Sequence, residues 1–116
     1  MSVDYVELLR DMNSKIKDLN GLQSEVIAGF GGMKAGAIKD GALSAKTKEL
    51  IALSLGVDTQ CDPCIAFHAQ ACFKYGATRE EVAEALGVCV MMGGGPKLMY
   101  ASKALAAYDQ FVAAAA

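Results

Sequence analysis

The sequence predicts an all-α fold, a compact bundle of about six helices in one domain that spans residues 1–116. Apolar residues recur at steps of three and four along the chain, which is the spacing of one face of a helix. No segment sustains the alternation of apolar and polar residues that is typical of a strand. Capping residues, glycines and prolines separate the periodic segments, as expected where helices begin and end.

The first two helices are expected in the amino-terminal third of the chain. Apolar steps run from Val6 to Leu19, and the pair Asn20-Gly21 is expected to end that helix. A second set of steps runs from Leu22 to Met33. The glycines at 29, 31 and 32 weaken a helix there or allow another helix to approach closely.

Two more helices are expected in the middle of the chain. Ser44 is a favourable N-cap for a third helix, which runs to about Val57. A fourth helix is expected from about Pro63 to Tyr75, before a glycine. Pro63 suits the first position of that helix, and Asp62 suits its N-cap.

The last two helices are separated by a glycine-rich break. Thr78, with Glu81 three residues later, forms a capping box for a fifth helix. The segment 93–96, Gly-Gly-Gly-Pro, is expected to separate this helix from a last one that runs from about Pro96 to Phe111. Residues 113–116 are four alanines, which we expect to fray.

Charge and apolar content limit the partners that the chain can have. Lys and Arg number 11 and Asp and Glu 13, so the net charge is -2 and no basic stripe favours nucleic acid. Hydrophobic residues make up 53% of this small chain, so we expect a homo-oligomer that buries part of them. No apolar run reaches the ~18 residues of a membrane helix, and Asp4 and Glu7 argue against a signal peptide. We therefore expect a cytoplasmic protein without a membrane partner.

A C-x-x-C-x-x-x-H motif, from Cys61 through Cys64 to His68, is the main candidate for chemistry. Cys64 falls in the first turn of the fourth expected helix, where unpaired amides and the helix dipole favour a thiolate. His68 follows four residues later on the same face, within reach of Cys64 as a proton acceptor or ion-pair partner. Cys61 lies just before the helix, where a turn can bring its sulfur to Cys64. The motif therefore offers a nucleophile, a base and a second thiol.

The same cysteine pair could instead bind zinc, because a C-x-x-C in a cytosolic protein is either redox-active or metal-binding. Cys61, Cys64, His68 and Cys72 are spread over ~16 Å of one helix, too far for one tetrahedral ion. A three-ligand site without Cys72 remains open at this point. Our preferred expectation is a redox pair with no metal and no cofactor, with Cys72 and Cys89 as buried structural residues.

Glu49 is the remaining candidate site residue. It falls in the middle of the third expected helix, with small apolar residues at neighbouring positions of the same face. One interpretation is a solvent-facing carboxylate paired with Lys46. The other is a carboxylate that orients His68 and holds its proton, as in acid–base relays.

Glu49 followed by C-x-x-C-x-x-x-H resembles the core of the alkylhydroperoxidase-D-like branch of the carboxymuconolactone decarboxylase family. The segments 47–53 and 93–96 also look like that family, and the resemblance covers roughly residues 43–105. It implies an all-α fold that assembles as a homotrimer or homohexamer. It also implies a peroxidase in which Cys64 attacks a hydroperoxide, Cys61 resolves it as a disulfide, and an external dithiol reduces the pair. His68 and Glu49 would match the proton relay.

One departure from the family affects the expected activity. Better-known members carry an additional relay histidine directly before the second cysteine, where this chain has Pro63. Efficient peroxide turnover is affected more than dithiol–disulfide exchange. The alternatives are a thiol–disulfide oxidoreductase or redox sensor, and a non-catalytic oligomer whose C-x-x-C binds zinc or is inert. Lactone decarboxylation is a poor match, because that branch lacks the cysteine pair.

Overall fold

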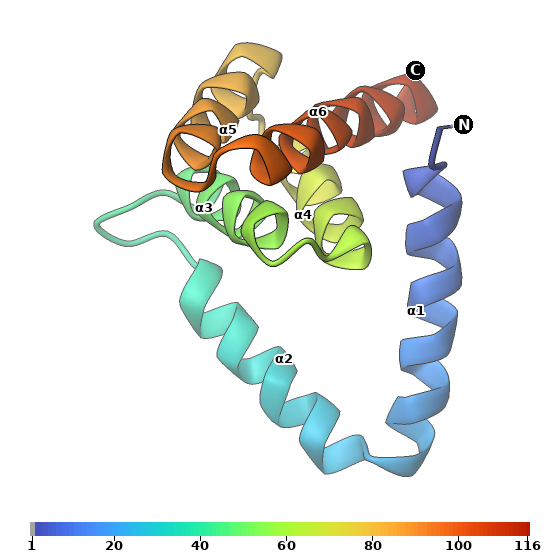
Figure 1. Ribbon diagram of the computed structural model, residues 1–116. Coiled ribbons are helices and arrows are strands. Elements are labelled where there is room, and N and C mark those ends of the chain that lie inside the picture. Colours follow the sequence, from blue (N-terminus) through green and yellow to red (C-terminus); the bar gives the residue numbers. More distant parts are fainter. Residues whose placement is uncertain (1) are drawn as a thin grey trace.

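The computed structural model describes residues 2–116, so Met1 of the predicted domain lies outside the described residues (Figure 1). These residues form helices and no strand, which confirms the predicted all-α class. The six helices are α1 (Tyr5–Leu22), α2 (Ser24–Ile38), α3 (Ala45–Asp58), α4 (Asp62–Lys74), α5 (Arg79–Gly93) and α6 (Gly95–Ala115).

Helices α1 and α2 are longer than the sequence predicted. The pair Asn20-Gly21 lies inside α1, which ends at Leu22, and only Gln23 separates it from α2. The N–H of Gln23 donates to the carbonyl of Leu19 at 2.8 Å, so the helical hydrogen-bond pattern of α1 continues into the turn. Helix α2 continues to Ile38, past the predicted end near Met33.

The caps predicted for α3 and α5 are confirmed. The hydroxyl of Ser44 accepts a hydrogen bond from the N–H of Thr47 at 3.1 Å. The side chain of Thr78 accepts from the N–H of Glu81, while the Glu81 carboxylate accepts from the N–H of Thr78, which completes the capping box. Each cap satisfies amides that have no partner inside the helix.

The break between α5 and α6 is sharper than expected, and the last helix is longer. Gly94 alone separates the two helices, and its φ of 74° is in the left-handed region that glycine adopts without steric cost. Helix α6 extends to Ala115, so the prediction of a frayed tail from residue 113 is wrong. Alanine has the highest intrinsic helix propensity, which explains the continuation of α6.

Helix α4 lies against α1, α3 and α6 and forms the centre of the bundle (Figure 1). Many of its neighbours are alanines, which let the helix axes approach closely. The hydroxyl of Tyr108 in α6 donates to the carbonyl of Ala77 at 2.7 Å and ties α6 to the turn after α4. The buried residues of the central helices are Leu53, Val57, Ile65, Ala66, Ala69, Cys72, Ala101, Ala104 and Ala107.

The segment 12–38, which we call the arm, differs from the rest of the fold. Figure 1 shows α1 and α2 as the two sides of a V that projects from the bundle. No side chain between residues 10 and 44 is buried, although apolar residues are frequent there. Within residues 2–116, no helix combines the length and apolar content needed to cross a membrane.

Candidate active site

Helix α4 begins at the cysteine motif, and a sulfur atom caps it. Sγ of Cys61 accepts a hydrogen bond from the N–H of Cys64 at 3.2 Å, so Cys61 is the N-cap. Asp62, predicted as the N-cap, is instead the first helical residue, followed by Pro63. Its carboxylate is turned to other partners, which explains why it does not cap the helix. Cys64 is the third residue of the helix, in the first turn as predicted.

Cys61 and Cys64 form a disulfide, with their Cα atoms 5.2 Å apart. Cys64 is exposed and Cys61 is half-buried, so a small molecule can reach the pair from solvent. In this oxidised state neither sulfur is a thiolate, which is the form that binds zinc. Within residues 2–116, no group of three or more His, Cys, Asp or Glu side chains is arranged to hold a metal ion.

The turn before the disulfide brings α3 and α4 close together. Gln60 has a φ of 55°, and the N–H of Cys61 donates to the carbonyl of Gly56 at 3.1 Å. A Cβ atom on Gly56 would lie 3.3 Å from Cβ of Cys64. A larger residue at position 56 would therefore push the first turn of α4 away from α3.

His68 and Glu49 form a partly buried pair across the same two helices. Nδ1 of His68 lies 2.6 Å from Oε1 of Glu49, and with the carboxylate ionised the ring N–H donates. Glu49 is only 1% exposed, whereas the His68 side chain keeps 22% of its surface accessible. The alternative pairing of Glu49 with Lys46 is wrong, because Lys46 pairs with Glu81 at 2.8 Å. The carboxylate thus fixes the ring orientation and leaves Nε2 as the proton-accepting nitrogen.

Two residues that the sequence analysis did not single out hold the start of α4. The hydroxyl of Tyr5 donates to Oδ1 of Asp62 at 2.9 Å, and Nζ of Lys103 lies 3.1 Å from the same oxygen. Burial and the neighbouring Asp62 carboxylate raise the pKa of the Tyr5 hydroxyl, so it stays a donor at neutral pH. Tyr5 and Lys103 are far from Asp62 in sequence, and no local pattern points to them.

The other two cysteines are separate from the pair. Cys72 is buried as predicted, and burial together with the nearby Glu49 carboxylate raises the pKa of its thiol to about 12. Cys89 is half-buried rather than fully buried, because it borders a surface cavity between α3 and α5, with Sγ 3.5 Å from the carbonyl oxygen of Ser54. Burial also raises the pKa of the Cys89 thiol. Neither residue resembles an activated nucleophile.

Cys64 and His68 both open onto a groove of about 460 Å³ between α4 and the arm. This volume is in the range of small-molecule sites. Pro63 also lines the groove. The remaining lining residues, which define the groove, are Leu9, Met12, Asn13, Ile16, Ile27, Phe30, Gly31, Lys34 and Phe67.

Comparisons with known protein sequences identify the family of the chain. The sequence model of the carboxymuconolactone decarboxylase family matches residues 24–107. An uncharacterized protein of Cupriavidus necator is 42% identical over 109 residues, which cover 94% of this chain and 96% of that protein. An uncharacterized protein of Haemophilus influenzae is 33% identical over the same length and coverage.

Solved structures agree with the fold and the family. A carboxymuconolactone decarboxylase family protein from Legionella pneumophila has a TM-score of 0.90 at 46% identity, covering 92% of this chain and 96% of its own. A family protein from Thermotoga maritima, for which a part in the antioxidative response has been suggested, has a TM-score of 0.70 at 28% identity. That match covers 96% of this chain and 92% of the Thermotoga protein. With its all-α fold, its matched C-x-x-C motif and these relatives, the chain belongs to the carboxymuconolactone decarboxylase family.

Proposed function

We propose that the chain is a thiol-dependent peroxidase that reduces organic hydroperoxides with Cys64 and Cys61. The observation that carries this proposal is the accessible disulfide at the start of α4, one turn before His68, which pairs with the buried Glu49. A disulfide at that place is the product expected of a two-cysteine peroxidase. The suggested antioxidative part of the Thermotoga relative supports the same activity.

In the proposed reaction, the thiolate of Cys64 attacks the terminal peroxide oxygen and the O–O bond breaks. Cys64 becomes a sulfenic acid, and the alkoxide takes a proton and leaves as an alcohol. The thiolate of Cys61 then attacks the sulfenic sulfur, hydroxide leaves and is protonated to water, and the disulfide forms. An external dithiol reduces the disulfide by exchange and is itself oxidised to a disulfide.

His68 is proposed as the base that takes the Cys64 thiol proton and gives it to the alkoxide. Glu49, at 2.6 Å from Nδ1, would hold the ring and stabilise its protonated form. The backbone N–H groups of the first turn of α4 and the helix dipole favour the thiolate in addition. His68→Ala is therefore expected to move the pH at which Cys64 alkylates upward, and an unchanged profile would remove His68 from the mechanism.

Thiol titration tests the proposal directly. The protein is reduced, freed of reductant and mixed with one equivalent of an organic hydroperoxide. We expect two thiols per chain to disappear, and Cys64→Ser to prevent disulfide formation. Cys89→Ser is the matched control, since Cys89 is a half-buried thiol outside the site, and it should react as the unmodified chain does. Retention of both site thiols near neutral pH would contradict the peroxidase.

A thiol–disulfide oxidoreductase is the second candidate, and Pro63 is the observation that favours it. Proline lines the groove beside Cys64 but has no ionisable group, so it cannot relay a proton. Peroxide reduction releases an alkoxide, which needs a proton. Dithiol–disulfide exchange releases a thiolate, which needs less proton transfer. Slow reaction with hydroperoxides together with fast exchange with a dithiol would favour this candidate.

We also propose that the chain assembles as a homotrimer or homohexamer in the cytoplasm. Several large apolar side chains of α2, α5 and α6 are exposed, and a second copy would remove them from water. A reducing compartment would also keep the dithiol form available between turnovers. Light scattering coupled to size exclusion measures the assembly, and a monomer at micromolar concentration would contradict it. The exposed residues include Met33, Val88, Met91, Met92 and Met99.

A further inference from the structure

The groove beside Cys64 has an apolar wall and a single ammonium group. Helix α1 contributes Leu9, Met12 and Ile16, and helix α2 contributes Ile27 and Phe30. Lys34 is the one Lys or Arg among the groove residues that the structure describes. An amphipathic molecule with one negative charge therefore matches the groove better than a small neutral one.

Lys34 is held at this place by an aromatic ring. Its Nζ lies 3.9 Å from the centroid of Phe67, and the side chain is half-buried. Within residues 2–116, Lys34 forms no ion pair, so its charge has no carboxylate partner. Phe67 precedes His68 and lies about one turn after Cys64 in α4, so the ammonium group and the cysteine pair border the same groove.

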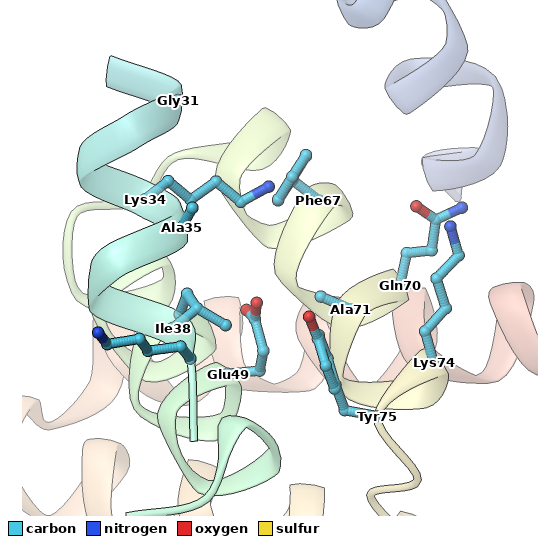
Figure 2. Close-up of a pocket in the computed structure, with 11 residues that line it drawn as sticks. Gly31, Lys34, Ala35, Ile38, Glu49, Phe67, Gln70, Ala71, Lys74 and Tyr75 are labelled. Carbon is cyan, nitrogen blue, oxygen red and sulfur yellow. The ribbon is translucent and has the colours of Figure 1, made fainter. Parts of the chain in front are cut away.

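A second cavity, of about 580 Å³, adjoins the groove on the other side of Phe67. Figure 2 shows Lys34 reaching across toward Phe67 at one end of this cavity, while Lys74 lies at the other end beside Gln70. Glu49 points into it from α3 (Figure 2), and this carboxylate disfavours an anion deeper in the cavity. Lys39 and Lys74 also line this cavity, but they do not line the groove onto which Cys64 opens. Lys34 lines both, so an anionic group paired with Lys34 can lie in the groove beside the cysteine pair.

We propose that the substrates of the peroxidase are long-chain organic acid hydroperoxides, such as fatty-acid hydroperoxides. The carboxylate pairs with Lys34, the hydrocarbon chain packs along the arm, and a peroxide several carbons from the carboxylate meets Cys64. This inference rests on the proposed peroxidase activity and adds the substrate class. The reaction balance is unchanged, since the acid hydroperoxide becomes a hydroxy acid and the dithiol supplies the electrons.

Binding to the disulfide form tests the carboxylate site without any turnover. Oleate and its methyl ester are titrated below the concentration at which they form micelles. Lys34→Met is expected to weaken oleate binding about tenfold and leave the ester unchanged, while Lys34→Arg retains the preference for the acid. Lys39→Met is the matched control, because Lys39 lines the second cavity but not the groove.

Single-turnover oxidation of the reduced protein tests the substrate class. Linoleic acid hydroperoxide is compared with its methyl ester and with tert-butyl hydroperoxide. We expect the acid to react about tenfold faster than the ester at equal low concentration. Lys34→Met should remove this difference between acid and ester, whereas Lys39→Met should retain it and leave the rate for tert-butyl hydroperoxide unchanged.

The outcomes separate this inference from the peroxidase proposal. If no hydroperoxide oxidises the cysteine pair while oleate still binds through Lys34, the peroxidase proposal fails and the acid site stands. If the acid and the ester react and bind equally, with Lys34→Met silent, the substrate class is wrong. If oleate does not bind to the disulfide form, the acid site is wrong. Disruption of an assembly by Phe30→Ser would then show that a second copy covers the groove.

Discussion

The bundle and the arm contain similar apolar residues, but the structure uses them in opposite ways. In the bundle, Leu53 and Ile65 are completely buried around α4. In the arm, Phe30 is 61% exposed and Val26 is equally open. The bundle therefore supplies stability and a fixed Glu49–His68 pair, whereas the arm supplies one wall of the groove. Composition reveals the apolar excess, and only the fold shows which apolar residues are left exposed.

The largest effect is expected when a buried leucine of the bundle is truncated and compared with an exposed leucine of the same helix. Leu53 and Leu55 are both in α3, but Leu53 is 0% and Leu55 59% exposed. We expect Leu53→Ala to lower the free energy of unfolding by about 2–5 kcal/mol, because it removes buried contacts and leaves a cavity. Leu55→Ala should change it by less than about 0.5 kcal/mol. Urea denaturation of both variants measures the difference, and equal losses would mean that the outer face of α3 is buried as well.

Tyr108→Phe should have the next largest effect. It removes the hydroxyl that donates to the carbonyl of Ala77 and leaves that oxygen without its partner. The expected loss is about 1–3 kcal/mol in the free energy of unfolding. Tyr75→Phe is the control, since Tyr75 is exposed and its variant should show no loss of stability.

Loss of the α5 capping box should cost less. Thr78→Ala removes the acceptor for the Glu81 N–H, so we expect about 1 kcal/mol less stability. Thr78→Ser keeps the hydroxyl and should remain close to the unmodified chain. Thermal unfolding of the two variants side by side checks this, and equal melting temperatures would remove the cap from the stability of the bundle.

Alkaline pH should weaken the bundle through Cys72. Its thiol has a pKa of about 12 in the fold and 9.0 as the reference for the unfolded chain. The unfolded chain loses this proton first, so stability is complete below about pH 9 and falls as pH rises toward about 12. Cys72→Ala should flatten this part of a stability–pH curve. A slope that does not change would assign the alkaline loss to other groups, such as Tyr5, whose pKa is also raised.

The smallest effect on the folded chain itself is expected in the arm. Met33→Ser, at an exposed arm residue outside the groove, should change the unfolding free energy by less than about 0.5 kcal/mol in dilute solution, where the chain is dissociated. At high protein concentration the same variant should lose stability relative to the unmodified chain, because assembly stabilises by mass action. An effect that is large and independent of concentration would show that the arm belongs to the bundle.

The predictable parts of the molecule depend on neighbours in sequence. The caps at Ser44 and Thr78 are local, and so is the spacing that puts Cys64 in the first turn of α4. The end of α1 was missed because helical hydrogen bonding carries the chain through Gly21. Local propensity gives way to such context at single residues.

The parts of the site that could not be predicted depend on residues far apart in sequence. Asp62 has the right chemistry for an N-cap, but Tyr5 and Lys103 engage its carboxylate and a cysteine takes the cap. The choice between the two interpretations of Glu49 likewise needed the packing of α3 on α4, which puts its carboxylate at His68 and away from solvent.

The sulfur cap on α4 makes the backbone a sensor of the cysteine chemistry. The amide proton of Cys64 points at Sγ of Cys61, so its chemical environment changes whenever the sulfur–sulfur bond opens and Cys61 rotates away. Nuclear magnetic resonance of that single proton then follows the redox state of the cysteine pair in real time, without a dye or a coupled enzyme.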